Sequence, residues 1–132
     1  MNNSTEKKIS VQNVRVKYIR PKYKNLEKWC EDPDNVYIGR AGIVFVPKDK
    51  GSVRFPSKSS IWANPYKVRG SRTRDESIRM YEAYIRKKIK EDPDKYDLKL
   101  LKGKCLGCWC KPEACHGDVL RKLCMEKFGD FV

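Results

Sequence analysis

The stretch from residue 105 to residue 118 concentrates the side chains that can do chemistry. Four of the six cysteines stand there, at positions 105, 108, 110 and 115. The only histidine of the chain, His116, follows the last of them, and Asp118 stands two positions further on. Thiolate, imidazole and carboxylate groups at this spacing can hold a metal, carry out nucleophilic or acid/base catalysis, or serve packing alone.

The first interpretation is a zinc site. Its ligands would be Cys108, Cys110, Cys115 and His116. Two cysteines two positions apart on a strand have their Cα atoms roughly 6.5 Å apart, so the strand would have to curl to bring both thiolates to one zinc ion. Zinc is therefore the cofactor that this stretch could hold, at the cost of distorting the strand.

The second interpretation is a ligand pocket at a helix N-terminus, with Cys115, His116 and Asp118 as the catalytic residues. Backbone N–H groups and the helix dipole favour an anion at such a place and lower the pKa of a thiol. His116 or Asp118 would then do acid/base work. A third interpretation is structural: small cysteines fill the core and Asp118 only caps the helix.

Other candidates for ligand binding come from earlier in the chain. Gly39 and Arg40 end an expected strand, where glycine lets a ligand approach the backbone and arginine can bind a phosphate with two N–H groups. Trp62 could stack on a base and Asn64 could hydrogen-bond it, although burial in the core is the commoner fate of a tryptophan. Together with Cys110, these residues are the expected ligand-binding set.

The charge of the chain points to an anionic partner. Thirty basic and 17 acidic residues give a net charge of +13. Residues 36–70 contribute +6 of it, from 7 basic residues and 1 acidic residue. A basic excess favours a nucleotide or a nucleic acid as partner, and the alternative is a solubilising surface.

The length of 132 residues suits one domain. We expect residues 1–8 to be a flexible start and residues 9–132 to form a single α/β domain. No apolar run approaches the roughly 20 residues of a membrane span, and no apolar segment follows residues 1–8 as in a secretory signal. Clustered cysteines without a secretion signal indicate an intracellular, reducing compartment.

The elements that must position these side chains alternate between strands and helices. Thr73 and Glu76 form a capping-box pattern before a helix, and Asp118 is the expected N-cap of the last one. The predicted strands are 9–19, 36–40, 43–46 and 104–110, the predicted helices are 74–90, a short one from residue 92, and 119–128, and a long loop is predicted over 47–60. This order favours an α/β fold in which helices flank a single small sheet.

The critical unit of that fold is the junction between strand 104–110 and the following helix, which is Rossmann-like. Strand 36–40 should be its neighbour in the sheet, with both strands ending on the same edge. In open α/β sheets, ligands bind at that edge. Arg40 and His116 are then expected to share one pocket.

The cysteine stretch resembles an uncharacterised domain family of viruses and bacteria, whose pattern includes Cys-Trp-Cys-x-Pro-x-x-Cys-His-x-Asp. The sequence supplies Cys108, Trp109, Cys110, Pro112, Cys115, His116 and Asp118. The similarity extends over about residues 36–124 and includes the segments 37–40 and 62–66. Ala63 departs from it, because the family more often has glycine there. The resemblance implies shared site residues and supplies no activity.

Two functions remain open at this stage. The first is a phosphate-ligand-binding α/β domain that acts as a small nucleotide-processing enzyme through its Cys/His/Asp pocket. The alternative is a basic nucleic-acid-associated binding protein whose cysteine motif is structural, with or without zinc. A concave pocket near His116 would favour the enzyme, and a flat basic face over residues 36–90 would favour the binding protein.

Overall fold

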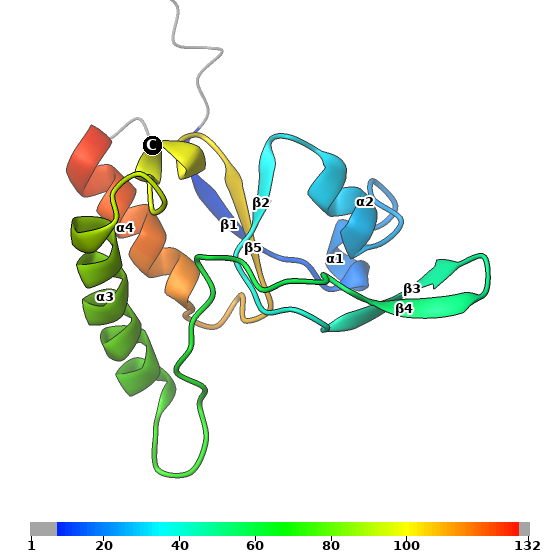
Figure 1. Cartoon of the computed structure of the whole chain (residues 1–132), viewed down its shortest axis with the longest axis horizontal. Helices are drawn as coiled ribbons and strands as arrows, with labels where there is room; N and C mark the ends of the chain where they lie inside the picture. Colours follow the sequence, from blue (N-terminus) through cyan, green and yellow to red (C-terminus); the bar gives the residue numbers. More distant parts are fainter. Residues whose placement is uncertain (1–7, 130–132) are drawn as a thin grey trace, which may run out of the picture.

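The centre of the fold is a three-stranded parallel sheet whose last strand in sequence lies in the middle. In the computed structural model, which describes residues 8–129, the order is β1 (Ser10–Asn13), β5 (Cys105–Cys108), β2 (Asn35–Tyr37) (Figure 1). Leu106 of β5 lies opposite residues of both neighbours. The α/β class and the pairing of β2 with β5 are as the sequence predicts. Parallel strands end on one edge, so the segments after β2 and β5 meet there.

Helices cover both faces of this sheet. The long helices α3 (Arg74–Glu91) and α4 (His116–Phe128) lie on one side, and the short helices α1 (Val16–Ile19) and α2 (Leu26–Glu31) lie on the other (Figure 1). Each side has its own buried cluster. The first is centred on Tyr81, Ile85, Leu106 and Leu120, and the second on Val14, Ile19, Leu26 and Trp29.

The central strand accepts α2 closely because it carries a glycine. A Cβ atom on Gly107 would lie 2.5 Å from the ring of Trp29 and 2.7 Å from Val14 Cγ1. Such distances are far inside van der Waals contact, so only glycine allows this packing. Trp29 itself is fully buried.

The predicted long helix is confirmed and runs from Arg74 to Glu91. Its capping box is present, since the Thr73 hydroxyl accepts from the Glu76 N–H and the Glu76 carboxylate accepts from the Thr73 N–H. Its apolar stripe buries Tyr81 and Ile85 completely. An ion pair between Arg86 and Glu126, with 3.0 Å between the charged atoms, links α3 to α4.

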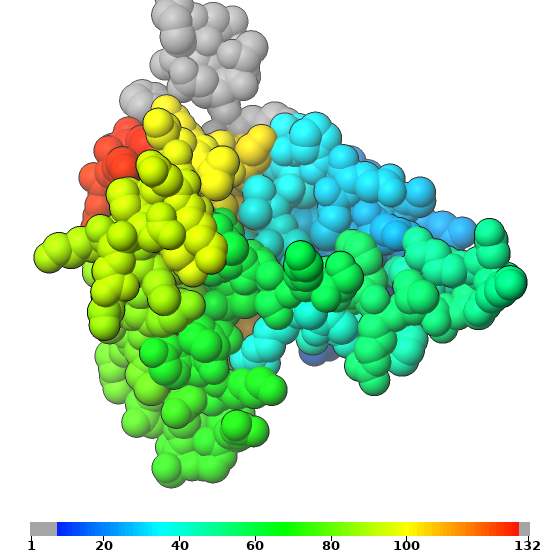
Figure 2. All heavy atoms as spheres, in the orientation of Figure 1, coloured from blue at the N-terminus to red at the C-terminus, as the bar shows by residue number. Residues whose placement is uncertain are grey.

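The predicted long loop over 47–60 is wrong. Much of it forms an antiparallel hairpin of β3 (Val44–Lys48) and β4 (Gly51–Phe55), a second sheet that projects from the body of the molecule (Figures 1 and 2). Gly51 has a φ of +100°, which a glycine adopts freely and which closes the tight turn. Only Val46 of this hairpin is fully buried, so most of its positions are free to carry charged or polar residues. These residues interrupt the alternation of apolar and polar residues by which a strand is predicted.

Several other element boundaries differ from the prediction. The expected strand 9–19 stops at Asn13, whose side chain accepts from the Arg15 N–H, and α1 follows. The short helix expected from residue 92 is a 3-10 helix, η2 (Leu98–Leu101), capped by Asp97. Strand 36–40 is β2 and ends at Tyr37, strand 104–110 is β5 and ends at Cys108, and strand 43–46 is part of β3.

The last helix begins three residues before the predicted one. Cys115 is its N-cap, and Asp118 stands in its first turn rather than at the cap. Residues 1–7 of the expected flexible start lie outside the described residues. Within residues 8–129, no helix has the length and apolar character needed to cross a membrane.

Candidate functional site

A pocket of about 360 Å³ lies at the carboxyl edge of the parallel sheet. Its walls come from the segments that follow β2 and β5, from the first turns of α3 and α4, and from the loop ahead of α3. Figure 2 shows the surface hollowed between the segment after β2, in cyan, and that loop, in green. This is the place where open α/β sheets bind ligands.

The side chains that line this pocket carry positive charge without any carboxylate. Arg40, Lys67 and Arg74 are the cations, and no Asp or Glu stands among the residues that form its wall. Residues of the first turns of α3 and α4 also line it, and a helix N-terminus carries about half a positive charge. The pocket is therefore suited to an anion.

Arg40 is held in place by a chain of hydrogen bonds that leads to α3. Its Nε and Nη2 atoms donate to the Asn64 carbonyl oxygen at 3.3 and 3.1 Å. The Asn64 side chain accepts from the Tyr66 N–H at 2.8 Å and donates to the Ser77 hydroxyl at 3.0 Å. Ser77 is buried and donates to the Tyr66 carbonyl. Among the described residues, Arg40 Nη1 has no further partner, which leaves it available to a ligand.

His116 is largely buried, and its ring packs against the core. Its Nε2 is 2.7 Å from the Ile38 carbonyl oxygen, so Nε2 carries the proton and donates it. Its ring meets that of Tyr81 edge-on, with 4.9 Å between the ring centres. Burial, together with the nearby charge of Arg40, lowers the pKa of His116 to about 4.

The other imidazole nitrogen of His116 is free. Within residues 8–129, Nδ1 has no hydrogen-bond partner, and no polar side-chain atom is both buried and unpartnered. Nδ1 is therefore accessible, and His116 is one of the residues that line the pocket. A neutral imidazole with a free Nδ1 can accept a hydrogen bond or a proton.

Two cysteines of the motif, Cys108 and Cys115, contact each other. The Cys115 thiol donates to Cys108 Sγ across 3.3 Å, and both residues are buried. This hydrogen bond lowers the pKa of Cys108 and raises that of Cys115, and the N–H groups of Cys110 and Lys111 also lower the pKa of Cys108. In this pair, Cys108 is the residue that more readily becomes a thiolate, and it accepts a hydrogen bond from the thiol of Cys115.

Comparison with known proteins shows which family the sequence belongs to. The family model described as "Domain of unknown function (DUF4326)" matches residues 19–126, which is most of the chain. The chain belongs to the DUF4326 family. This confirms the resemblance to an uncharacterised family of viruses and bacteria.

One relative comes from a bacteriophage. The chain is similar to the "Uncharacterized 12.4 kDa protein in nrdA-td intergenic region" of Enterobacteria phage T4. The two are 31% identical over 74 residues, which span 55% of this chain and 68% of the phage protein. No solved structure matches the chain.

The structure brings most of the expected site residues of this DUF4326 chain together. Gly39, Arg40, Asn64, Cys110, Cys115 and His116 all line the pocket. The amide of Asn64 is occupied by protein partners, so this residue positions Arg40 and Tyr66 instead of reading a base.

Trp62 and Asp118 do not line the pocket. Trp62 is 3% exposed and packs edge-on against Tyr96 in the core, so it offers no face for stacking. The Asp118 carboxylate accepts from the Cys115 N–H at 3.0 Å and pairs with the Lys111 ammonium at 2.5 Å. Both residues are structural in this geometry.

Among the pocket residues that the sequence did not assign to the site are Trp109, Lys67 and Arg74. Trp109 is partly exposed, lines the pocket, and donates from its indole to the Tyr37 hydroxyl at 2.8 Å. Lys67 and Arg74 supply two of the three cations. Trp109 stands inside the cysteine motif, which was the one available signal. Nothing in the sequence separates Lys67 and Arg74 from the many other basic residues.

The four proposed zinc ligands do not converge. In the described part of the chain, no three Cys, His, Asp or Glu side chains gather closely enough to hold a metal ion. Cys108 and Cys115 meet each other, but the Nε2 of His116 is turned to a backbone carbonyl. The donors present therefore do not fit a tetrahedral zinc ion in this arrangement.

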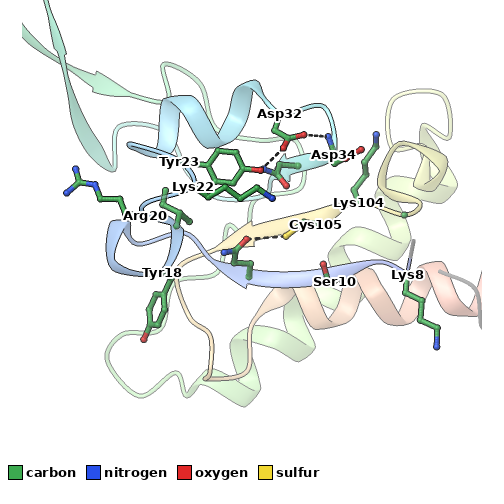
Figure 3. Close-up of a pocket in the computed structure, with 14 residues that line it drawn as sticks. Lys8, Ser10, Tyr18, Arg20, Lys22, Tyr23, Asp32, Asp34, Lys104 and Cys105 are labelled. Carbon is green, nitrogen blue, oxygen red and sulfur yellow. Dashed lines mark hydrogen bonds between the residues drawn. The ribbon is translucent and has the colours of Figure 1, made fainter. Parts of the chain in front are cut away.

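A second hollow, of about 330 Å³, lies at the opposite, amino edge of the sheet (Figure 3). Its polar groups mostly satisfy one another. The Tyr23 hydroxyl donates to Asp32, and the Lys104 ammonium donates to the Pro33 carbonyl at 2.8 Å. Asp32 and Asp34 stand among its lining residues together with its cations, so it lacks the uniform positive charge of the first pocket.

Proposed function

We propose that this DUF4326 chain binds a phosphate-bearing ligand of the nucleotide class in the pocket at the carboxyl edge of its sheet. The observation that carries the proposal is the charge of that pocket. Three cations and two helix N-termini face one cavity, and no carboxylate lines it. A phosphate group would be held by charge-assisted hydrogen bonds to Arg40 and Arg74 and by the helix dipoles.

The remaining walls suit the rest of a nucleotide. The cavity volume of about 360 Å³ is in the range of small-molecule sites. Trp109 and Tyr66 supply aromatic surface, and Ile43, Val68 and Ile78 supply apolar surface. A base has a flat π-face that such side chains accept.

His116 is the group in this pocket that is suited to accept a proton. Its Nδ1 is accessible and its imidazole is neutral at physiological pH, because its pKa is lowered to about 4. In the enzyme form of this proposal, His116 is the base, while Cys115 and Asp118 shape the helix end that carries it. A base with so low a pKa is weak, so its first role is to accept a hydrogen bond from the ligand.

The test compares ligands with and without phosphate. Isothermal titration calorimetry with adenosine 5′-monophosphate, the other nucleoside monophosphates and adenosine should show binding that depends on the phosphate. Replacement of both pocket arginines (Arg40→Gln with Arg74→Gln) should weaken the binding of the monophosphates by roughly a hundredfold or more, because each charged hydrogen bond contributes about 1.5–3 kcal/mol.

The matched control removes the same charge outside the pocket. Arg69→Gln with Arg79→Gln alters two exposed arginines that do not line the cavity, and the affinity should stay the same. Equal binding of adenosine and its monophosphate, or equal weakening by both double variants, would contradict the proposal.

A further inference from the structure

A groove separate from the phosphate pocket lies between the β3–β4 hairpin and the short helices α1 and α2. Figure 1 shows the hairpin beside these helices, and the groove encloses about 360 Å³. Its apolar lining residues include Val14, Val16, Leu26 and Val44. It shares only one lining residue, Trp109, with the pocket at the carboxyl edge.

The rim of this groove is positively charged. Arg15, Arg20 and Lys24 line it and are exposed, and none of its lining residues, all within the described chain, is acidic. Arg15 and Lys24 have no side-chain partner among the described residues, since only Arg20 is engaged, through a bond to the Lys24 carbonyl. These cations are therefore available to an anionic partner.

Two aromatic rings stand at the same groove. Phe45 is 63% exposed, a high value for a phenylalanine, and the Arg54 guanidinium lies 5.0 Å from its ring centre. Trp109 lines both this groove and the pocket at the carboxyl edge. A cation-rimmed groove with exposed rings is the arrangement that binds single-stranded nucleic acid, in which phosphates meet the cations and bases stack on the rings.

We propose that the groove between the hairpin and α1–α2 binds a single strand of DNA or RNA. The hairpin adds Lys50 and Arg54 to the surface beyond the rim, and Asp49 is its only acid. The whole chain carries +13, so the rim is part of a wider positive field that attracts a polyanion. The proposal does not depend on the phosphate pocket binding a nucleotide.

The test measures fluorescence anisotropy of labelled twelve-nucleotide oligo(dT) and oligo(rU) with the full chain at several salt concentrations. Binding should weaken steeply with salt. Arg15→Gln with Lys24→Gln should reduce the slope of log affinity against log salt by about 1.4, at roughly 0.7 per lost phosphate contact on a single strand. Phe45→Ala should weaken binding by roughly fivefold or more at constant salt, through lost stacking.

Matched controls separate this site from general charge attraction. Lys87→Gln with Lys90→Gln removes two exposed cations from α3, which lies on the far side of the molecule from the hairpin (Figure 1). If the oligonucleotide binds at the groove, its affinity for this variant should stay within about twofold of that for the parent. Arg74→Gln should also leave oligonucleotide binding intact, although it impairs the phosphate pocket.

Four results would overturn the proposal. They are no binding at low salt, equal loss in the α3 control, an unchanged affinity of Phe45→Ala, and displacement of the oligonucleotide by polyglutamate at equal charge concentration. The last would assign the groove to an acidic polypeptide instead. Circular dichroism of each variant confirms that the loss is not unfolding.

Discussion

The lowered pKa of His116, the single histidine, should make the stability of the protein depend on pH. Burial holds the pKa of His116 at about 4 in the folded chain, against an ordinary value of 6.5 when it is unfolded. The native state therefore binds fewer protons than the unfolded state between these two values, so stability rises with pH there. The stabilisation is complete above about pH 6.5 and is lost as the pH falls toward 4.

The size of the effect follows from the two pKa values. Linkage predicts that the free energy of unfolding falls by about 2 kcal/mol between about pH 7.5 and about pH 5, and by about 3 kcal/mol once the pH is below the folded pKa. The cause is physical and local. A protonated ring would keep its bond to the Ile38 carbonyl, but it would place a buried charge beside Arg40.

Two measurements check this prediction. Urea unfolding of the parent and of His116→Gln across this pH range should give curves that converge at low pH, because the variant keeps every carboxylate but lacks the imidazole. The imidazole resonance of the parent, unique in the chain, reports its pKa by nuclear magnetic resonance without any substitution. A folded-state pKa of 6 or higher would refute the argument that His116 is buried and neutral.

Three further predictions concern packing, capping and the thiol pair. Gly107→Ala should lower the free energy of unfolding, measured with urea, by about 1–3 kcal/mol, because the new methyl group would clash with Trp29. Ser52→Ala, on the exposed hairpin, is the control and should leave the free energy of unfolding unchanged. Asp118→Ala should cost about 1 kcal/mol in the same assay through the lost bond to the Cys115 N–H, and a cost near zero would contradict that role. Diamide should join Cys108 to Cys115 in a disulfide, with loss of two hydrogen atoms, and peptide mapping should find that bond absent in Cys108→Ser.

The sequence predicts the parts of this fold that rest on local rules. The helix 74–91 follows from its capping box and from the spacing of Tyr81 and Ile85, and both features are present. The pairing of β2 with β5 follows from the alternation of strands and helices, which is typical of parallel sheets. That pairing brings Arg40 and His116 to one pocket, as expected.

The parts that the sequence does not predict depend on tertiary contacts. The hairpin 44–55 buries little, so its pattern of alternating apolar residues is masked by charge. Trp62 is a core residue and Trp109 lines the pocket, although both are tryptophans in conspicuous motifs; the difference is set by the partners Tyr96 and Tyr37, which are distant in sequence. Arg74 can be assigned to the pocket only when the position of the N-terminus of α3 is known.

The arrangement of the cysteine motif explains how neighbouring residues of one short segment contact different parts of the molecule. Cys108, the last residue of β5, points into the core and meets Cys115. Trp109, its neighbour, points to the other side, because successive residues of an extended chain face opposite ways, and it reaches both the pocket and the groove.

The contact between the two sulfurs joins the two ends of the loop 109–114, one at the strand end and one at the helix cap. A loop fixed at both ends in this way holds the indole of Trp109 at a defined position. If both proposed sites bind their ligands, loss of the Cys108–Cys115 contact should therefore alter binding at both through Trp109, whereas loss of Arg40 or of Phe45 should affect only one of them.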